Sequence, residues 1–287
     1  MKGKNQILFR YIAIISITIL GIMVATIRCS SMIRKSFHEQ LEQNLKDVAI
    51  QNADALQRQI YDRYDLLQNV AEALDAAPNR REQLLDTFVP MTKAFHIKRI
   101  GFCDETGLAH ATDGSATYLA HREFFQKGMQ GQNWISDVLE DAMDDKHEFV
   151  TVMSMPIHSE SGEINGIAAM TFETAQLNEE LSTNSFEGMG DSFLISQRGQ
   201  VILTSNPKLM NISDNMFSEI LNKEKRNEKI VPALMLNINK QTESRGTLYL
   251  NGQAYYYQLL PVSLMDDCVT WYVVTIIPTN YMQNRFH

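Results

Sequence analysis

Cysteine and clustered basic residues are scarce in this chain, and each shortage excludes a class of protein. The three cysteines, Cys29, Cys103 and Cys268, are too few and too scattered for a disulfide framework, and no two stand at the spacing of zinc ligands. A single bridge between Cys103 and Cys268 is the one pairing left open. The formal net charge is −8 and no stripe of Lys and Arg is present, which argues against a nucleic-acid partner. We therefore expect no metal site, no cofactor and no nucleic acid.

Catalytic signatures are absent as well. The sequence has no Gly-x-Ser-x-Gly, no His-Glu-x-x-His, no phosphate loop and no dinucleotide fingerprint. The segment Gly190-Asp191-Ser192-Phe193 matches the start of a GDSL hydrolase motif, but it opens a strand and no Asp-x-x-His pair follows it. We predict that the chain is not an enzyme.

Long apolar runs are few, and the longest lies near the N-terminus. The stretch YIAIISITILGIMVATI, which begins at Tyr11, carries no charge and is long enough to cross a bilayer with the apolar residues before it. We interpret 11–28 as a retained transmembrane helix and 1–10 as a cytoplasmic tail. A cleaved signal peptide is the alternative, which Arg28 and Cys29 at the cleavage position disfavour. The protein is thus expected in the cell membrane, with a single N-terminal anchor and an extracytoplasmic main domain.

A polar helical stretch follows the anchor. Over 30–77, apolar residues recur at three- and four-residue steps without any internal Gly or Pro, which predicts one long stalk helix. At about 1.5 Å per residue this helix would be roughly 70 Å long, too long for one small domain to cover. The apolar face nearest the membrane is expected to have nothing of its own chain to pack against, so we predict a homodimer through the stalk. That face comprises Ile33, Phe37, Leu41, Leu45 and Val48.

The rest of the chain contains one strand-rich pattern twice. Each half has an early hairpin, a helical segment and a closing pair of long strands. Pro156 stands ten residues before Gly166, and Pro261 stands ten residues before Trp271, within the two closing pairs. The sequence therefore predicts an α+β fold with two similar antiparallel-sheet domains in tandem, over 79–175 and 176–280.

An acidic segment over 137–148 lies within the first half. It contains six acidic residues and one lysine. Its acids lack the regular spacing and the glycine of a calcium-binding loop. A cation site is the disfavoured interpretation, and a solvated connector is expected.

Five segments, in this order along the chain, resemble the double Cache sensor domain of bacterial transmembrane receptors. They are GFCDETGLAHATDG, HREFFQKGMQGQNWIS, VMSMPIHSESGEINGIAAMTF, GMGDSFLISQRGQVILTSNP and LNGQAYYYQLLPV. The resemblance covers nearly the whole chain and implies two PAS-like sheets along the stalk, with a small ligand in the membrane-distal domain, 79–175. It also implies a second membrane helix, which 281–287 would begin. The output domain beyond it would be a diguanylate cyclase, a histidine kinase or a chemotaxis module.

The same resemblance indicates a ligand site. Arg122-Glu123-Phe124-Phe125 is similar to the Arg-x-Trp-Tyr segment with which amino-acid-binding double Cache domains clamp a carboxylate. An Arg fork binds a carboxylate through two parallel hydrogen bonds. Thr171 stands where those domains have an ammonium-binding Asp, and Leu139 stands where they have a Tyr. The ligand classes left open are therefore a carboxylate, an amino-acid-like molecule and a less polar solute. The candidate site residues are Arg122, Phe124, Phe125, Trp134, Ser136, Asp113, Asp137, Ser154 and Thr171.

Two questions about this site stay open at the level of sequence. Arg122 requires a partner, which is Asp113, Asp137 or an anion from outside. Alternatively, Phe124 and Phe125 only pack a helix onto a sheet, and Arg122 is solvated. The first hypothesis for function is an extracytoplasmic sensor that binds a small solute and passes the signal across the membrane. Its alternative is a membrane-anchored solute-binding or adaptor protein that does not signal.

Overall fold

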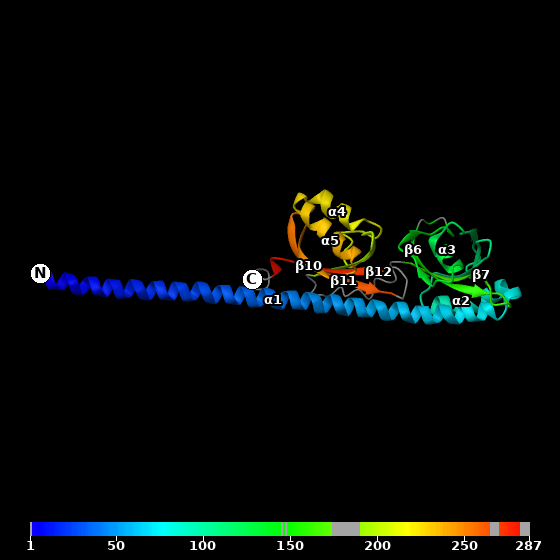
Figure 1. Ribbon diagram of the computed structural model, residues 1–287, viewed down its shortest axis with the longest axis horizontal. Helices are drawn as coiled ribbons and strands as arrows, with labels where there is room; N and C mark the ends of the chain where they lie inside the picture. The colour runs from blue at the N-terminus through cyan, green and yellow to red at the C-terminus, as the bar shows by residue number, and fades with distance from the viewer. Residues whose placement is uncertain (1, 145, 147, 174–189, 265–269, 282–287) are drawn as a thin grey trace. The chain divides into compact units, whose positions relative to one another are not determined.

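The structure is a computed structural model of the chain (Figure 1). It describes residues 2–144, 146, 148–173, 190–264 and 270–281, without the side chains of 2–15, 17, 34 and 38. The chain divides into two compact units, Met1–Lys46 and Asp47–His287. One helix, α1 (Lys2–Asp75), begins in the first unit and ends in the second.

The first unit consists of the N-terminal part of α1. Among the described residues, no helix combines the length and hydropathy that a membrane crossing needs. The side chains of 11–15 and 17, inside the expected span, lie outside the described ones. The expectation that the face from Ile33 to Val48 stays uncovered in the single chain is wrong for two of its members. Ile33 is 61% exposed, whereas Leu41 and Leu45 are already 5% and 2% exposed without a second chain.

In the second unit, α1 supplies one face of the core. Its side chains at three- and four-residue steps, such as Leu56, Ile60 and Leu67, pack in one cluster with residues of both β-sheets. The helix ends at Asp75, shortly before the Ala77-Pro78 junction, where proline disfavours a helical residue in front of it. Arg81 donates a hydrogen bond to the Leu74 carbonyl at 3.2 Å, which satisfies one of the unpaired groups at the helix end.

The first sheet has seven strands in the order β3-β2-β1-β7-β6-β4, with β5 also paired to β6. A short 3₁₀ turn, η1 (Pro78–Arg80), and α2 (Arg81–Ala94) lead into it. The turn between its first two strands needs Gly107, whose φ is +87°, because a Cβ there would lie 2.5 Å from the Cβ of Ala120. Its elements are β1 (Arg99–Asp104), β2 (Leu108–Ala111), β3 (Ala116–Tyr118), α3 (Glu123–Met129), β4 (Trp134–Ile135), β5 (Leu139–Glu140), β6 (Phe149–His158) and β7 (Ile164–Glu173).

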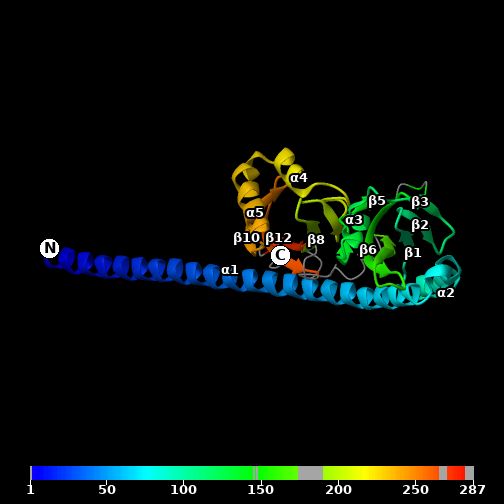
Figure 2. The same cartoon turned by 45° about the vertical axis from the view of Figure 1, so that its right-hand side comes forward.

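The two faces of this sheet have different partners because side chains alternate along a strand. Ile100 and Phe102 of β1 face the core shared with α1 and α2. Cys103 of β1 and Val152 of β6 face a separate cluster with α3. Figures 1 and 2 both show α1 and α3 on opposite sides of the β6–β7 pair.

The second sheet has five strands in the order β10-β11-β12-β8-β9. One face packs on two helices, and the other joins the core cluster that contains α1. Asn52 of α1 donates a buried hydrogen bond to the Ser192 hydroxyl at 3.0 Å, which fixes the register of helix and sheet. The elements are β8 (Asp191–Ser196), β9 (Val201–Thr204), α4 (Met216–Lys223), η4 (Lys225–Lys229), α5 (Ile230–Asn239), β10 (Ser244–Leu250), β11 (Gln253–Ser263) and β12 (Thr270–Pro278).

The internal repeat expected from the sequence has a structural counterpart. Pro156 of β6 lies opposite Ile167, and Pro261 of β11 lies opposite Tyr272. In both strands the proline lies beyond the last residue paired to the other neighbouring strand, Ser154 or Leu259, so no ladder hydrogen bond is lost there. The α+β class with two antiparallel sheets is confirmed. The segment 282–287, in which a second membrane helix is expected to begin, lies outside the described residues.

Candidate ligand-binding site

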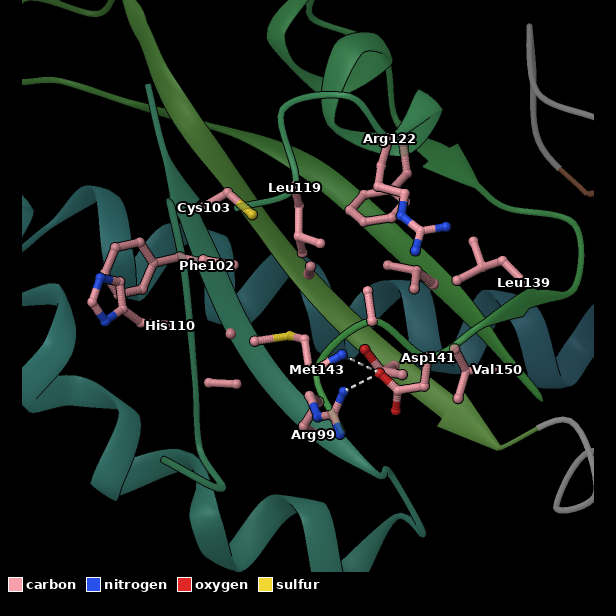
Figure 3. A pocket seen from close by; sticks show the side chains of 18 residues that line it. Arg99, Phe102, Cys103, His110, Leu119, Arg122, Leu139, Asp141, Met143 and Val150 are labelled. Carbon is pink, nitrogen blue, oxygen red and sulfur yellow. Dashed lines mark hydrogen bonds and ion pairs between the residues drawn. The ribbon is translucent and has the colours of Figure 1, made fainter. Parts of the chain in front are cut away.

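A cavity of about 40 Å³ lies on the α3 side of the first sheet (Figure 3). It exists because the strands present small residues there: Gly101 of β1, Ala109 and Ala111 of β2, and Ala169 of β7 all line it. Leu119, Phe124 and Val152 supply larger apolar walls. A cavity needs about 10–15 Å³ of volume for each water molecule that it holds, so this cavity holds on the order of three waters.

Arg122 lines this cavity from the start of α3. It is the N-cap residue of the helix, with extended backbone angles, and its N–H is held by the Leu119 carbonyl at 2.9 Å. Its Nε is fully buried and has no hydrogen-bond partner within the described part of the chain. Figure 3 shows the guanidinium on the α3 side of the cavity, across from Arg99 and Asp141. A cation held in this way favours an anion as its neighbour.

Arg99, on the opposite side, is fully paired. It is 3% exposed, and its Nη1 lies 2.6 Å from Asp141 Oδ1 while its Nε lies 2.8 Å from Asp113 Oδ2. Lys98 Nζ contacts Asp141 Oδ2 at 2.7 Å and the carboxylates of Asp144 and Glu148 at 2.6 Å each. Two cations and four carboxylates therefore form one ion cluster.

The pKa values in this cluster follow from the pairing. Burial opposes ionisation of Asp141, but hydrogen bonds from Arg99 and Lys98 outweigh it and lower the pKa of this carboxyl. The hydrogen bond from Lys98 lowers the pKa of Asp144 to about 2. Burial disfavours the Lys98 ammonium, yet its bonds to the carboxylates raise its pKa above the usual value. All of these groups are consequently ionised at neutral pH.

The acidic segment is therefore not the solvated connector expected from the sequence. Asp141 is 6% exposed, and its Oδ1 also accepts the Met143 N–H at 2.9 Å. Leu139 and Met143 of the same segment line the cavity, so the ion cluster holds one wall in place. Within the described residues, no group of three or more metal-ligating side chains is present. Three acids of this segment, Asp141, Asp144 and Glu148, instead bind the chain's own cations.

A sequence model of the Cache domain matches residues 30–286. The chain belongs to the Cache domain family. The resemblance to a double Cache sensor domain, drawn from five sequence segments, is thereby confirmed. No curated protein sequence matches the chain.

Solved structures share the Cache fold at low sequence identity. The ligand-binding domain of the amino acid chemoreceptor PctB of Pseudomonas aeruginosa, in complex with L-Arg, is 18% identical, covers 85% of this chain and 97% of its own, and has a TM-score of 0.67. The corresponding domain of CtaA of Pseudomonas fluorescens, in complex with L-isoleucine, is 15% identical, covers 88% and 98%, and has a TM-score of 0.69. The extracellular domain of the putative histidine kinase rpHK1S-Z16 is 13% identical, covers 85% and 97%, and has a TM-score of 0.67.

Three of the nine site residues expected from the Cache resemblance line the cavity together: Arg122, Phe124 and Thr171. Three more lie behind the lining and support it. Phe125 and Trp134 are buried in the α3 cluster, and the Ser154 hydroxyl donates to the Phe124 carbonyl at 3.0 Å.

The other three expected residues have different neighbours. Asp113 is paired with Arg99, outside the lining. The Ser136 hydroxyl accepts the Val152 N–H at 2.9 Å. Asp137 accepts the Trp271 indole N–H at 3.3 Å, and burial raises the pKa of this carboxyl. Arg122 is thus paired with neither of the acids that the sequence had offered as its partner.

Several lining residues were missed at the level of sequence. Arg99, Gly101 and Cys103 come from alternate positions of β1, and Ala169 stands two positions before the expected Thr171 in β7. The period-two pattern of these strands was a signal that could have placed them on one face. Cys103 is a buried free thiol, and Cys268 lies outside the described residues.

Proposed function

We propose that this chain is the ligand-sensing region of a bacterial transmembrane receptor and that it binds a small anionic solute in the cavity beside α3. The observation that carries the proposal is the Arg122 guanidinium, which reaches into an apolar cavity with its Nε buried and unpartnered. A carboxylate fits such a fork by two parallel, charge-assisted hydrogen bonds. The apolar walls exclude water and strengthen that ion pair.

Solved structures of the same fold support the choice of a ligand that carries a carboxylate. Domains of the same fold were solved with L-Arg and with L-isoleucine, each of which carries a carboxylate. In this chain Phe124 replaces the hydrogen-bonding side chain expected beside the arginine, so Arg122 supplies the polar recognition.

We further propose that α1 passes the signal toward the membrane. Residues 11–28 serve as the anchor, and the helix runs without a break from Lys2 to Asp75. Side chains of α1 pack in the same core cluster as both sheets, so a change in the first sheet reaches the helix by direct contact.

A thermal-shift screen of the full chain tests the binding proposal. A ligand that binds the folded state raises its melting temperature, so carboxylates, amino acids, amines and nucleobases are screened in parallel. For each hit, Arg122→Gln should abolish the shift and leave the melting temperature of the protein alone nearly unchanged, because among the described residues no carboxylate pairs with Arg122.

Lys127→Gln is the matched control. It removes a positive charge from the same helix, where Lys127 lies 4.8 Å over the Trp134 ring and outside the cavity lining. The control should keep the ligand-induced shift. Equal shifts in wild type and Arg122→Gln would remove Arg122 from the site and contradict the proposal.

A further inference from the structure

The charges of the cavity are asymmetric. Among the described lining residues of the cavity, Asp141 is the one that carries a carboxylate, and both of its oxygens contact cations. Oδ1 lies 2.6 Å from Arg99 Nη1 and Oδ2 lies 2.7 Å from Lys98 Nζ. The Met143 N–H also donates to Oδ1 at 2.9 Å. The cavity therefore offers an unpaired cation, Arg122, and no carboxylate that is free of a cation.

The other acids nearby do not alter this. Asp113 binds Arg99 Nε at 2.8 Å and is outside the lining. Asp144 and Glu148 bind Lys98 and are also outside it. An ammonium group placed in the cavity would compete with Arg99 and Lys98 for Asp141, whose two partners are fixed by the fold. It would lose its hydration without gaining a counter-ion of its own.

We infer that the cavity selects a short-chain carboxylate that carries no ammonium group, with the carboxylate on Arg122 and the tail among Leu119, Phe124 and Val152. This rests on the proposed function and deepens it by naming the class of ligand. The size of the cavity limits the tail. A volume that holds on the order of three waters admits a tail of a few carbons, such as that of isovalerate, and leaves no room for a much longer one.

Four compounds of nearly the same shape differ in which charged groups they carry, and so test each group separately. Isovalerate has the carboxylate alone, L-valine adds an ammonium group to the same skeleton, isobutylamine has the ammonium group alone, and isovaleramide is neutral. Titration calorimetry on the full chain measures each. Isovalerate should bind, and L-valine should bind at least about tenfold more weakly, since a buried unpaired charge costs more than the free energy of a tenfold change in affinity. Isobutylamine and isovaleramide should give no measurable binding.

The outcomes distinguish this inference from the function on which it rests. If L-valine binds as well as or better than isovalerate, and Arg122→Gln abolishes its binding, the site stands and the selectivity for carboxylates without an ammonium group is overturned. If isobutylamine or isovaleramide binds as well as isovalerate, both are overturned, because Arg122 then does not anchor an anion. If isovalerate, acetate, propionate and butyrate all fail to bind, the inference is overturned. An amino acid that binds in the thermal screen would in that case still support the proposed function.

Discussion

Of the residues in and around the first sheet, Asp141 is the one whose replacement should lower the free energy of unfolding most. It is 3% exposed at its side chain and joins Arg99, also 3% exposed, to Lys98, which is 9% exposed. Removing one partner of a buried ion pair costs about 3–5 kcal/mol because the other charge stays buried without compensation. Arg99 keeps Asp113 and Lys98 keeps Asp144, so the lower end applies. For Asp141→Asn we expect the free energy of unfolding to fall by about 3 kcal/mol.

Circular dichroism during heating of the full chain measures this loss. At about 2–4 °C per kcal/mol for a domain of this size, the melting temperature of Asp141→Asn should fall by roughly 6–12 °C. Glu148→Gln is the matched control, since Glu148 touches the same Lys98 at 2.6 Å but its side chain is 38% exposed. An exposed pair is worth about 0–1 kcal/mol, so the control should lose no more than about 4 °C. If the melting temperature falls equally in the two variants, the reasoning that the burial of Asp141 determines the loss of stability is refuted.

Three further predictions concern pH, the cavity and the stalk. The folded-state pKa values of Asp113, Asp141 and Asp144 are lowered, to about 2 for Asp144. The stability that these ionised carboxylates contribute is therefore present above the unfolded-state pKa of about 3.9. It is lost as the pH falls through their folded-state pKa values. The melting temperatures of wild type and Asp141→Asn should consequently converge toward about pH 2. Ala169→Leu should fill the cavity and weaken isovalerate binding at least about tenfold in calorimetry; unchanged affinity would place the ligand elsewhere. In membranes, Phe37→Cys in a Cys29→Ser background should crosslink to a second copy more readily than Glu42→Cys; similar yields would reject a dimer through this face.

The repeated strand pattern was readable from the sequence because hairpins and alternation are local. The long strands β6, β7, β11 and β12 and the equivalence of Pro156 and Pro261 all follow from spacing within short stretches. The low exposure of Leu41 and Leu45 was not readable, because periodicity shows that a helix has an apolar face but not how exposed each residue of that face is.

The candidate site was readable only in part, for a similar reason. Arg122 was found by resemblance, but the successive residues Phe124 and Phe125 diverge by about 100° around a helix, so only one of them lines the cavity. The pairing of Arg99 with Asp141 joins residues 42 positions apart, and no local pattern reveals such a contact. That pairing is nevertheless what leaves Arg122, among the described lining residues, as the cation without a carboxylate partner.

A crystal structure of the full chain with isovalerate tests the central claim most directly. The account predicts the carboxylate within hydrogen-bond distance of Arg122 Nε and a terminal guanidinium nitrogen, with the branched tail against Leu119 and Val152 and the Arg99–Asp141 pair intact. Isovalerate seated elsewhere, for example in the separate groove that Arg122 shares with Arg198 and Asn215, would contradict it. So would a carboxylate bound to Arg99 in place of Asp141.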